Sequence, residues 1–292
     1  MISIAVLLTC HNRKAKTLGC LTALFAQKLL DVTLKVYLVD DGCTDGTAVA
    51  VAAAFSQVTL IKGDGQLYWN GGMRKCWQFA QQQQQSDFYL LLNDDVELCH
   101  DAIQRLVACF YATSNAGAVI GTMRDSKTSV ASYGGRNVRF WLHPMWTTDV
   151  LTPEDVPIPC DYINGNLCLI PADAVNKVGI LSERFTHSMG DFDYGVRLRR
   201  AGFSLFVAPG FYGFCDRNPL SGSIRDPSIP IEQRLRWMSK PNVCPPLTEW
   251  RWFIRQHGGP VWPFLYVKAT IGRLFPKLWL WLNQKSTKTP KS

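Results

Sequence analysis

Short apolar runs alternate with helically patterned segments in the first part of this 292-residue chain. Residues 4–8, 35–39 and 58–61 are mostly apolar, and each run is followed by a polar or glycine-containing turn. Such runs are typical of buried strands in a parallel sheet, because both faces of that sheet are covered. Residues 15–27 and 47–55 are apolar at helical spacing. The pattern therefore predicts a βαβαβ unit.

The alternation continues less regularly into the second half. It predicts a third helix over 71–85, ending in a run of glutamines, and a fourth strand over 88–92. The carboxyl end of that strand presents Asn93, Asp94 and Asp95 at the edge where open α/β sheets bind ligands. Shorter strands are predicted at 119–120, 168–170 and 205–207, and helices at 172–178 and 193–201. The expected fold class is α/β.

The last part of the chain has a different composition. A segment rich in proline and polar residues, 218–230, precedes it, and we expect one domain over 1–215 followed by a mostly helical extension over 216–292 with a disordered end. The formal net charge of +8 comes entirely from residues 251–292, which contain basic and no acidic residues. Aromatic residues are interleaved with these bases. This mixture is typical of a segment that lies on an anionic membrane surface.

The sequence leaves a second interpretation of this basic extension open, namely a helix packed on the first domain with a solvated basic end. The apolar stretch 260–283 resembles a membrane span, but prolines and basic residues interrupt it, so lying on the membrane is favoured over crossing it. Nucleic acid is not expected as a partner, because no recognised reader motif accompanies the bases.

The cysteines and the start of the chain predict a cytoplasmic protein, at the inner face of the plasma membrane if the extension binds lipid. The first eight residues lack a positively charged leader and are interpreted as a strand, not as a signal peptide. The ten cysteines include no Cys-x-x-Cys pair, which favours a reducing compartment and small core residues. We assign none of them to a metal.

Carboxylates follow two of the predicted strands. A divalent cation held by Asp94 and Asp95 would neutralise charge developing on a diphosphate leaving group, although Asp94 could instead cap a helix. Asp41 follows the second strand, where a carboxylate can accept hydrogen bonds from a nucleotide. A glycine turn with a helix cap explains Asp45 well, but explains Asp40 and Asp41 poorly. These features predict group transfer from a phosphorylated donor, most simply a nucleotide sugar.

Four motifs follow one another in order over about residues 1–215. They are Thr9-Cys10-His11-Asn12-Arg13, Asp40-Asp41-Gly42 with Thr44-Asp45-Gly46-Thr47, Leu92-Asn93-Asp94-Asp95, and Gly190-Asp191-Phe192-Asp193 with the residues up to Gly202. Together they resemble family-2 inverting glycosyltransferases of the GT-A fold. Residues 63–73 and 164–166 are similar to segments of bacterial rhamnosyl- and galactosyltransferase-type enzymes of surface-polysaccharide assembly. The resemblance implies a mixed, mostly parallel sheet and a UDP- or dTDP-sugar donor, with a glycan or lipid-linked glycan as acceptor.

The resemblance also implies roles for individual residues. Asp191 would be the general base, and Asp95 would hold Mn²⁺ or Mg²⁺. The nucleotide and donor would be bound by Thr9, His11, Arg13, Asp41, Asp64, Trp69, Gly72 and Asp94. Asn164 and Asn166 are expected to bind the acceptor, because amides pair with hydroxyls. Asp193 would either orient the acceptor or begin the following helix, where a carboxylate favours the helix dipole.

The sequence departs from the family pattern at two positions. Gly190 stands where a glutamate often precedes the base, and Cys215 lies in a region where some members supply a histidine to the metal. A thiol is a poor ligand for a hard cation. The alternative function is a catalytically silent scaffold that binds nucleotide or membrane. A nucleotidyltransferase is disfavoured, because residues 9–13 are not a Gly-rich loop with Arg and Lys.

Overall fold

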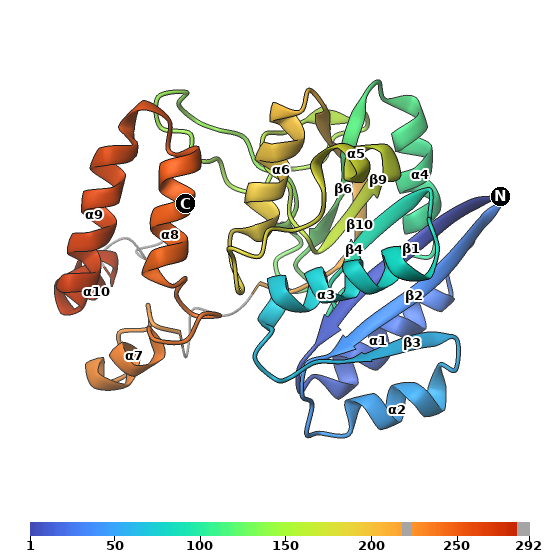
Figure 1. The fold of residues 1–292 in the computed structure, drawn as a ribbon, viewed down its shortest axis with the longest axis horizontal. Helices are drawn as coiled ribbons and strands as arrows, with labels where there is room; N and C mark the ends of the chain where they lie inside the picture. Colours follow the sequence, from blue (N-terminus) through green and yellow to red (C-terminus); the bar gives the residue numbers. More distant parts are fainter. Residues whose placement is uncertain (218–222, 285–292) are drawn as a thin grey trace. The chain divides into compact units, whose positions relative to one another are not determined.

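The computed structural model describes residues 1–217 and 223–284. The predicted disordered end, and the first part of the predicted linker, lie outside the described residues. The chain divides into two compact units (Figure 1). Residues 1–137 and 147–217 make up the first unit, and residues 138–146 with 223–284 make up the described part of the second.

The first unit contains one mixed sheet. Among the described residues its strand order is β3-β2-β1-β4-β9-β6-β10-β5, with β7 paired to β6 and β8 to β10. β1 runs parallel to β2 and β4, whereas β9 runs antiparallel to β4 and β6. The strands are β1 (Ile2–Cys10), β2 (Val32–Asp40), β3 (Val58–Lys62), β4 (Phe88–Leu92), β5 (Glu97–Leu98), β6 (Ala116–Arg124), β7 (Ala131–Tyr133), β8 (Ile158–Pro159), β9 (Leu167–Pro171) and β10 (Ser204–Phe214).

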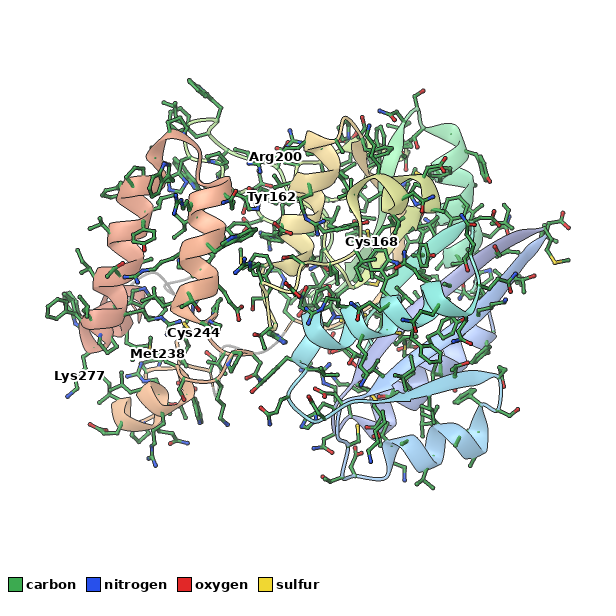
Figure 2. All side chains as sticks on the ribbon, viewed as in Figure 1. Tyr162, Cys168, Arg200, Met238, Cys244 and Lys277 are labelled. Atoms are coloured by element: carbon green, nitrogen blue, oxygen red, sulfur yellow. The ribbon has the colours of Figure 1, made fainter. Side chains whose placement is uncertain are left out.

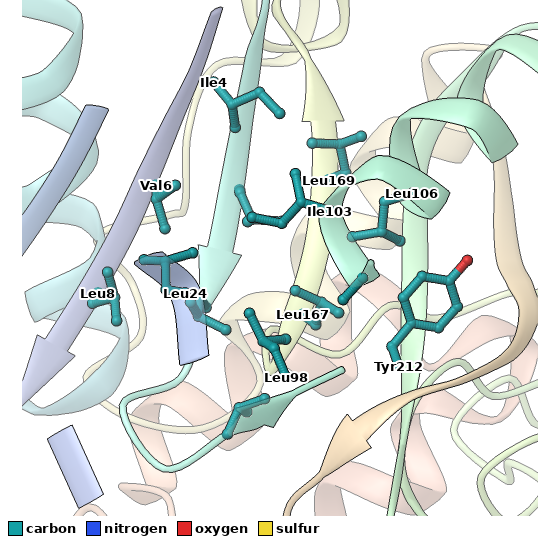
Figure 3. Packing of buried hydrophobic residues seen from close by; sticks show 14 of the residues in the cluster. Ile4, Val6, Leu8, Leu24, Leu98, Ile103, Leu106, Leu167, Leu169 and Tyr212 are labelled. Carbon is teal, nitrogen blue, oxygen red and sulfur yellow. The ribbon is translucent and has the colours of Figure 1, made fainter. Parts of the chain in front are cut away.

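Helices cover both faces of this sheet (Figure 1). The helices of the first unit are α1 (Lys14–Phe25), α2 (Thr47–Ala54), α3 (Tyr68–Gln83), α4 (Ala102–Ala112), α5 (Ala172–Val178) and α6 (Gly190–Arg200). The central strand β1 is buried from its third residue to its last, as expected for a parallel strand covered on both sides. Its side chains alternate between two cores, so that Ile4, Val6 and Leu8 face α1, α2 and α4. Figure 3 shows this first core, where Leu24 and Ile103 approach β1 and β4.

The second core lies on the opposite face of the sheet. Ala5 and Leu7 of β1 meet Trp77 of α3 and Tyr194 of α6 there. The ring centroids of Trp77 and Tyr194 are 5.4 Å apart. These buried aromatic side chains fix α3 and α6 on the sheet, and each of these helices begins at the edge that carries the predicted site.

The predicted fold class is confirmed. The predicted early strands, the first three helices, the fourth strand and helix 172–178 all appear, with bounds shifted by at most a few residues. Helix α4 and the short strands β5, β7 and β8 were not predicted, and β6 and β10 are longer than the predicted strands 119–120 and 205–207. Helix α6 begins at Gly190 instead of 193, which places Asp191 within the helix and not before it.

The second unit is helical in its described part. Its helices are α7 (Ile231–Trp237), α8 (Leu247–His257), the 3₁₀ turn η1 (Gly259–Val261), α9 (Trp262–Leu274) and α10 (Pro276–Gln284). Met238, Cys244 and Leu280 belong to a small core of this unit, whereas Lys277 points away from it (Figure 2). A search of the described helices for a segment long and apolar enough to span a bilayer found none.

Candidate active site

The predicted site residues gather at one edge of the sheet. Strands β2, β1 and β4 are parallel neighbours, so their carboxyl ends lie together. They carry the segments 40–41, 9–13 and 93–95, respectively. The fold thus brings together three motifs that are up to eighty residues apart in the sequence, as expected for ligand binding in an open α/β sheet.

Arg13 links the two adjacent carboxylates after β4. One guanidinium nitrogen, Nη1, lies 3.2 Å from Asp94 Oδ1 and 3.0 Å from Asp95 Oδ2. Thr17 of α1 donates a hydrogen bond of 3.1 Å to the other oxygen of Asp94, and Lys16 Nζ lies 3.8 Å from Asp95 Oδ2. Burial raises the pKa of Asp94 to about 6, against the opposing effect of Arg13. Sequence reasoning missed Lys16 and Thr17, which lie three and four positions beyond Arg13, the last residue of the first motif.

Asp95 is the more accessible of the two carboxylates and is therefore the better placed of the two to reach a cation. The exposed fraction of its side chain is 13%, against 6% for Asp94. Cys215 follows β10, and its thiol lies 3.6 Å from Asp95 Oδ1, close enough to neighbour a cation bound there. The carboxylate oxygens of this donor set fit Mg²⁺ or Mn²⁺, which prefer oxygen ligands, while the thiol does not. The residues therefore fit a hard cation through Asp95, completed by ligands from outside the chain.

Asp41 organises the loop that leads into α3. Its buried carboxylate accepts hydrogen bonds from the backbone N–H groups of Gly65, Leu67 and Tyr68 at 2.9, 3.3 and 3.0 Å. His11 Nδ1 lies 2.6 Å from the backbone oxygen of Asp41. The Asp41 side chain therefore fixes the path of the 65–68 loop, and the contact with its backbone oxygen places the His11 ring beside the end of β2.

Asp64 lies on the exposed side of the same loop, where its carboxylate accepts a hydrogen bond of 2.8 Å from the backbone N–H of Gln66. Gly72 of α3 faces Thr9, and a Cβ at Gly72 would lie 2.2 Å from Thr9 Oγ1. Glycine at this position is therefore required for the close approach of α3 to the end of β1. Of these residues, Asp64 is open to solvent, whereas Thr9 is buried beneath α3.

Trp69 connects α3 to the 93–95 segment. Its indole Nε1 donates a hydrogen bond of 2.7 Å to Asn93 Oδ1. A Cβ at Gly165 would lie 2.2 Å from the Trp69 ring, so the indole packs directly on the 164–166 turn. Asn93 was not among the predicted site residues, although it stands in the same motif as Asp94 and Asp95.

The 164–166 turn joins Asp191 to the end of β4. Asp191 Oδ2 accepts long hydrogen bonds from Asn164 Nδ2 at 3.4 Å and from the Gly165 N–H at 3.3 Å. On the other side of the turn, Asn93 donates to the backbone oxygen of Asn166 at 3.0 Å and to its amide oxygen at 3.1 Å. Residues from β4, the 164–166 turn and α6 thus form one continuous set of hydrogen bonds.

Burial raises the pKa of Asp191 to about 6, although the backbone N–H groups of Phe192 and Gly165 oppose this effect. A carboxylate with such a pKa is ionised near neutral pH and is a stronger proton acceptor than an exposed one. Arg136 contributes an opposing charge, but its own pKa is lowered by burial. The arrangement is suited to accepting a proton.

Asp193 differs from its neighbour Asp191. Its side chain is fully buried and forms an ion pair of 2.8 Å with Arg197 one turn later in α6. Contact between Asp193 and a bound sugar would require this ion pair to separate. That would leave a buried charge without its partner, which is strongly unfavourable. The contacts favour the helix-start interpretation of Asp193 over the acceptor-binding one.

The packing around position 190 explains why this chain has glycine there and not the glutamate of the family pattern. A Cβ at this position would lie 1.7 Å from Asn70 Oδ1, while Asn70 Nδ2 holds the backbone oxygens of Ser182 and Phe185. A glutamate at 190 has no room while Asn70 occupies this buried position. Glycine and Asn70 are therefore matched to each other, and together they fix the start of α6 next to Asp191.

We expect Gly190→Ala to lower the free energy of unfolding by about 1–3 kcal/mol, because the added methyl group overpacks a rigid site. Urea denaturation of the purified variant would measure this. The matched control is Gly19→Ala in α1, where a Cβ meets nothing within 4 Å and a helical alanine is expected to be stabilising by about 0.5–1 kcal/mol. Equal stability of the two variants would contradict the packing argument.

A family model described as "Glycosyltransferase like family 2" matches residues 3–240. This chain belongs to glycosyltransferase family 2. The match covers the sheet from the second residue of β1 onward and every residue of the candidate site, and it extends into the second unit.

Curated relatives of this family-2 chain include the N-acetylglucosaminyl-diphospho-decaprenol L-rhamnosyltransferase of Mycobacterium tuberculosis, in two strains. It is 27% identical over 199 residues, which are 60% of this chain and 64% of the relative. The chain therefore matches somewhat less than two thirds of the length of these relatives.

Two solved structures share the fold. The mannosyltransferase PcManGT of Pyrobaculum calidifontis, solved with GDP-Man and Mn²⁺, gives a TM-score of 0.56 at 14% identity, covering 97% of this chain and 73% of that protein. Residues 1–349 of S. aureus TarS give 0.50 at 15% identity, covering 74% and 60%. At these identities the likeness supports the fold alone, and it agrees with the predicted GT-A architecture.

Proposed function

We propose that this family-2 chain is an inverting glycosyltransferase that moves a sugar from a nucleotide sugar to a glycan or lipid-linked glycan. The observation that carries the proposal is the hydrogen-bonded path from Asp191 through the 164–166 turn to Asn93, beside Asp94 and Asp95. It sets a buried proton acceptor near a carboxylate pair suited to a cation. UDP- or dTDP-sugars are the favoured donors, and the rhamnosyltransferase relative supports a lipid-linked N-acetylglucosamine acceptor.

In the proposed reaction, the Asp191 carboxylate removes the proton of an acceptor hydroxyl as that oxygen attacks the anomeric carbon of the donor. The bond from this carbon to the diphosphate breaks on the opposite face, and the configuration inverts. The amide of Asn164 is proposed to orient the acceptor hydroxyls. The Asn166 amide, predicted to do the same, is buried and bonded to Asn93 and Cys215, so it is proposed to hold the turn in place. Asp193 stays in its ion pair with Arg197 and supports the start of α6.

The donor is proposed to lie across the ends of β1, β2 and β4. His11 and Asp64 would contact the nucleoside, Asp41 and Thr9 would shape its site through the 65–68 loop and Gly72, and Trp69 would line the cleft. Arg13 is placed to move from the two carboxylates to the diphosphate. A divalent cation, Mn²⁺ or Mg²⁺, would be held by Asp95 with Asp94 nearby, and would stabilise negative charge on the leaving diphosphate.

The pKa of Asp191 predicts a pH dependence. Because the base acts in its ionised form, kcat/KM should be constant well above pH 6 and fall about tenfold per unit below it. A profile of kcat/KM between about pH 5 and pH 8 would test this. Asp94 has a raised pKa near the same value, so the Asp94→Asn variant serves as the control. The fall of kcat/KM at acidic pH should persist in the Asp94→Asn variant. Its disappearance would mean that protonation of Asp94, and not of Asp191, causes the fall.

The donor class can be tested by thermal shift with UDP, dTDP and GDP, each with and without Mn²⁺. The proposal predicts that one nucleotide raises the melting temperature and that Mn²⁺ increases the effect, because a ligand that binds the native state stabilises it. Stabilisation by none of the three would contradict the proposed donor site and would favour a scaffold without nucleotide chemistry.

We also propose that the second unit attaches the enzyme to the inner face of the plasma membrane. Exposed apolar side chains on α9 and α10 include Phe264, Leu274 and Leu278, and the exposed Lys268 and Lys277 lie among them. Apolar and basic groups on adjacent helical surfaces suit a bilayer that contains anionic lipid.

The double variant Lys268→Glu/Lys277→Glu should bind vesicles that contain phosphatidylserine more weakly, by about 1 kcal/mol for each basic residue near the surface. Vesicle sedimentation of the full chain would measure this binding, and added salt should weaken the wild type likewise. Neutral vesicles provide the control. Vesicle binding that is unchanged by both the substitutions and the added salt would contradict an electrostatic contribution.

A further inference from the structure

Two thiols and a carboxylate meet at the ends of β1 and β2, apart from the residues assigned to catalysis. Cys10 is the last residue of β1, Asp40 is the last of β2, and the two are paired in the sheet register. Cys43 follows in the loop after β2. Ligand atoms of these three residues all lie within 4.8 Å of one another.

The geometry of this cluster matches a thiophilic cation. Cys10 Sγ and Cys43 Sγ are 3.7 Å apart. Two thiolates that bind one tetrahedral Zn²⁺ at about 2.3 Å are separated by about 3.8 Å, as the tetrahedral angle requires. A disulfide would instead need about 2.05 Å between the sulfur atoms. The thiols therefore stand at the separation of a zinc-binding pair without being bonded to each other.

The surroundings of the cluster hold these ligands in place. Asp40 Oδ1 accepts a hydrogen bond of 2.8 Å from the backbone N–H of Cys43, which fixes the loop and keeps the carboxylate beside the thiol. The N–H of Asn12 lies 3.3 Å from Cys43 Sγ and donates to it. Such a donor stabilises a thiolate, and a fixed carboxylate supplies the negative charge that a divalent cation requires. Cys10 is buried, while Asp40 and Cys43 are partly exposed, so a cation can enter from the solvent side.

We propose that Cys10, Asp40 and Cys43 form a binding site for a thiophilic divalent cation such as Zn²⁺, with a water molecule as the fourth ligand. This site is chemically distinct from the carboxylates of Asp94 and Asp95, because thiolates select soft or borderline cations and exclude Mg²⁺. A cation here joins the end of β1 to the loop after β2. The site does not depend on the proposed glycosyl transfer.

Cobalt provides the test, because Co²⁺ bound by thiolates shows a charge-transfer absorption band that carboxylate-bound Co²⁺ lacks. The full chain, reduced with a phosphine, is titrated with Co²⁺ alone. We expect a thiolate band that saturates at one cobalt per chain, disappears on addition of Zn²⁺, and persists with excess Mg²⁺. Asp40→Asn keeps the acceptor for the Cys43 N–H but removes the charge, and it should weaken cobalt binding at least about tenfold.

Three cysteine variants assign the band. Cys43→Ser should lose it, whereas Cys99→Ser, which removes another partly buried free thiol, and Cys215→Ser, which removes the thiol beside Asp95, should keep it. The proposal is overturned if wild type gives no band, if Cys43→Ser retains it, or if Cys215→Ser abolishes it.

A measurement on the wild type makes the test independent of how the variants fold. Iodoacetamide alkylation is mapped by peptide mass spectrometry with and without Zn²⁺, since a metal-bound thiolate is protected. Zn²⁺ should abolish alkylation of Cys43 and leave that of Cys99 unchanged, and Mg²⁺ should protect neither. Equal reactivity of Cys43 with and without Zn²⁺ would overturn the site.

Discussion

Replacing Asp191 with asparagine is expected to lower kcat by about 10²- to 10⁴-fold, because the amide cannot accept the proton of the acceptor hydroxyl. The amide has nearly the shape of the carboxylate, and its oxygen can still accept the hydrogen bonds from Asn164 and Gly165. Binding of the donor nucleotide should therefore be unchanged. Steady-state kinetics of sugar transfer, together with nucleotide titration calorimetry, would measure the two effects separately.

Asp173→Asn is the matched control for this variant, since Asp173 is an exposed carboxylate in the first turn of α5, away from the site. It should retain wild-type kcat. An Asp191→Asn variant with wild-type kcat would remove Asp191 from the chemistry and would favour a scaffold role. Loss of nucleotide binding together with turnover would mean that Asp191 supports the site structurally.

Replacing Asp95 with alanine should abolish the part of nucleotide binding that depends on Mn²⁺. Asp95 is the more exposed carboxylate of the pair, and its oxygens face Arg13, Lys16 and Cys215. Loss of a residue that only supports a metal ligand typically costs about 10- to 100-fold in metal affinity or activity, and loss of a ligand itself should cost at least as much. We expect at least this loss for the Mn²⁺-dependent part of nucleotide binding, measured by calorimetry with and without the cation.

Binding measured without Mn²⁺ is the internal control for Asp95→Ala. It should be retained, because Asp41 and His11 are held by contacts that do not involve Asp95. Circular dichroism would verify that the variant is folded. If Mn²⁺ strengthens nucleotide binding equally in the wild type and in Asp95→Ala, the cation is held elsewhere and the metal assignment is wrong.

The strands of the first unit could be predicted because they are buried on both faces. A run such as 88–92 is apolar at every position, and its bounds coincide with β4. Helix α4 was missed, although Ile103, Leu106 and Val107 repeat at helical spacing and are buried. Its neighbour β5 has just two residues, so the local alternation of strand and helix gave little guidance there.

The position of the site could also be predicted, because parallel strands bring their carboxyl ends together. The contacts between residues within the site could not be predicted. The hydrogen bonds of Asp41 to the 65–68 loop depend on the path of that loop, and the ion pair between Asp193 and Arg197 depends on which face of α6 is buried. The match between Gly190 and Asn70 joins residues 120 positions apart, which no local pattern reveals.

Sugar transfer itself tests the central claim most directly. The wild-type protein would be incubated with a panel of UDP-, dTDP- and GDP-sugars, Mn²⁺ or Mg²⁺, and glycan and lipid-linked N-acetylglucosamine acceptors. The anomeric configuration of the product would then be determined by NMR. The account predicts transfer from one class of donor with inversion at the anomeric carbon. Transfer with retention, or neither transfer nor hydrolysis with any donor, would contradict it.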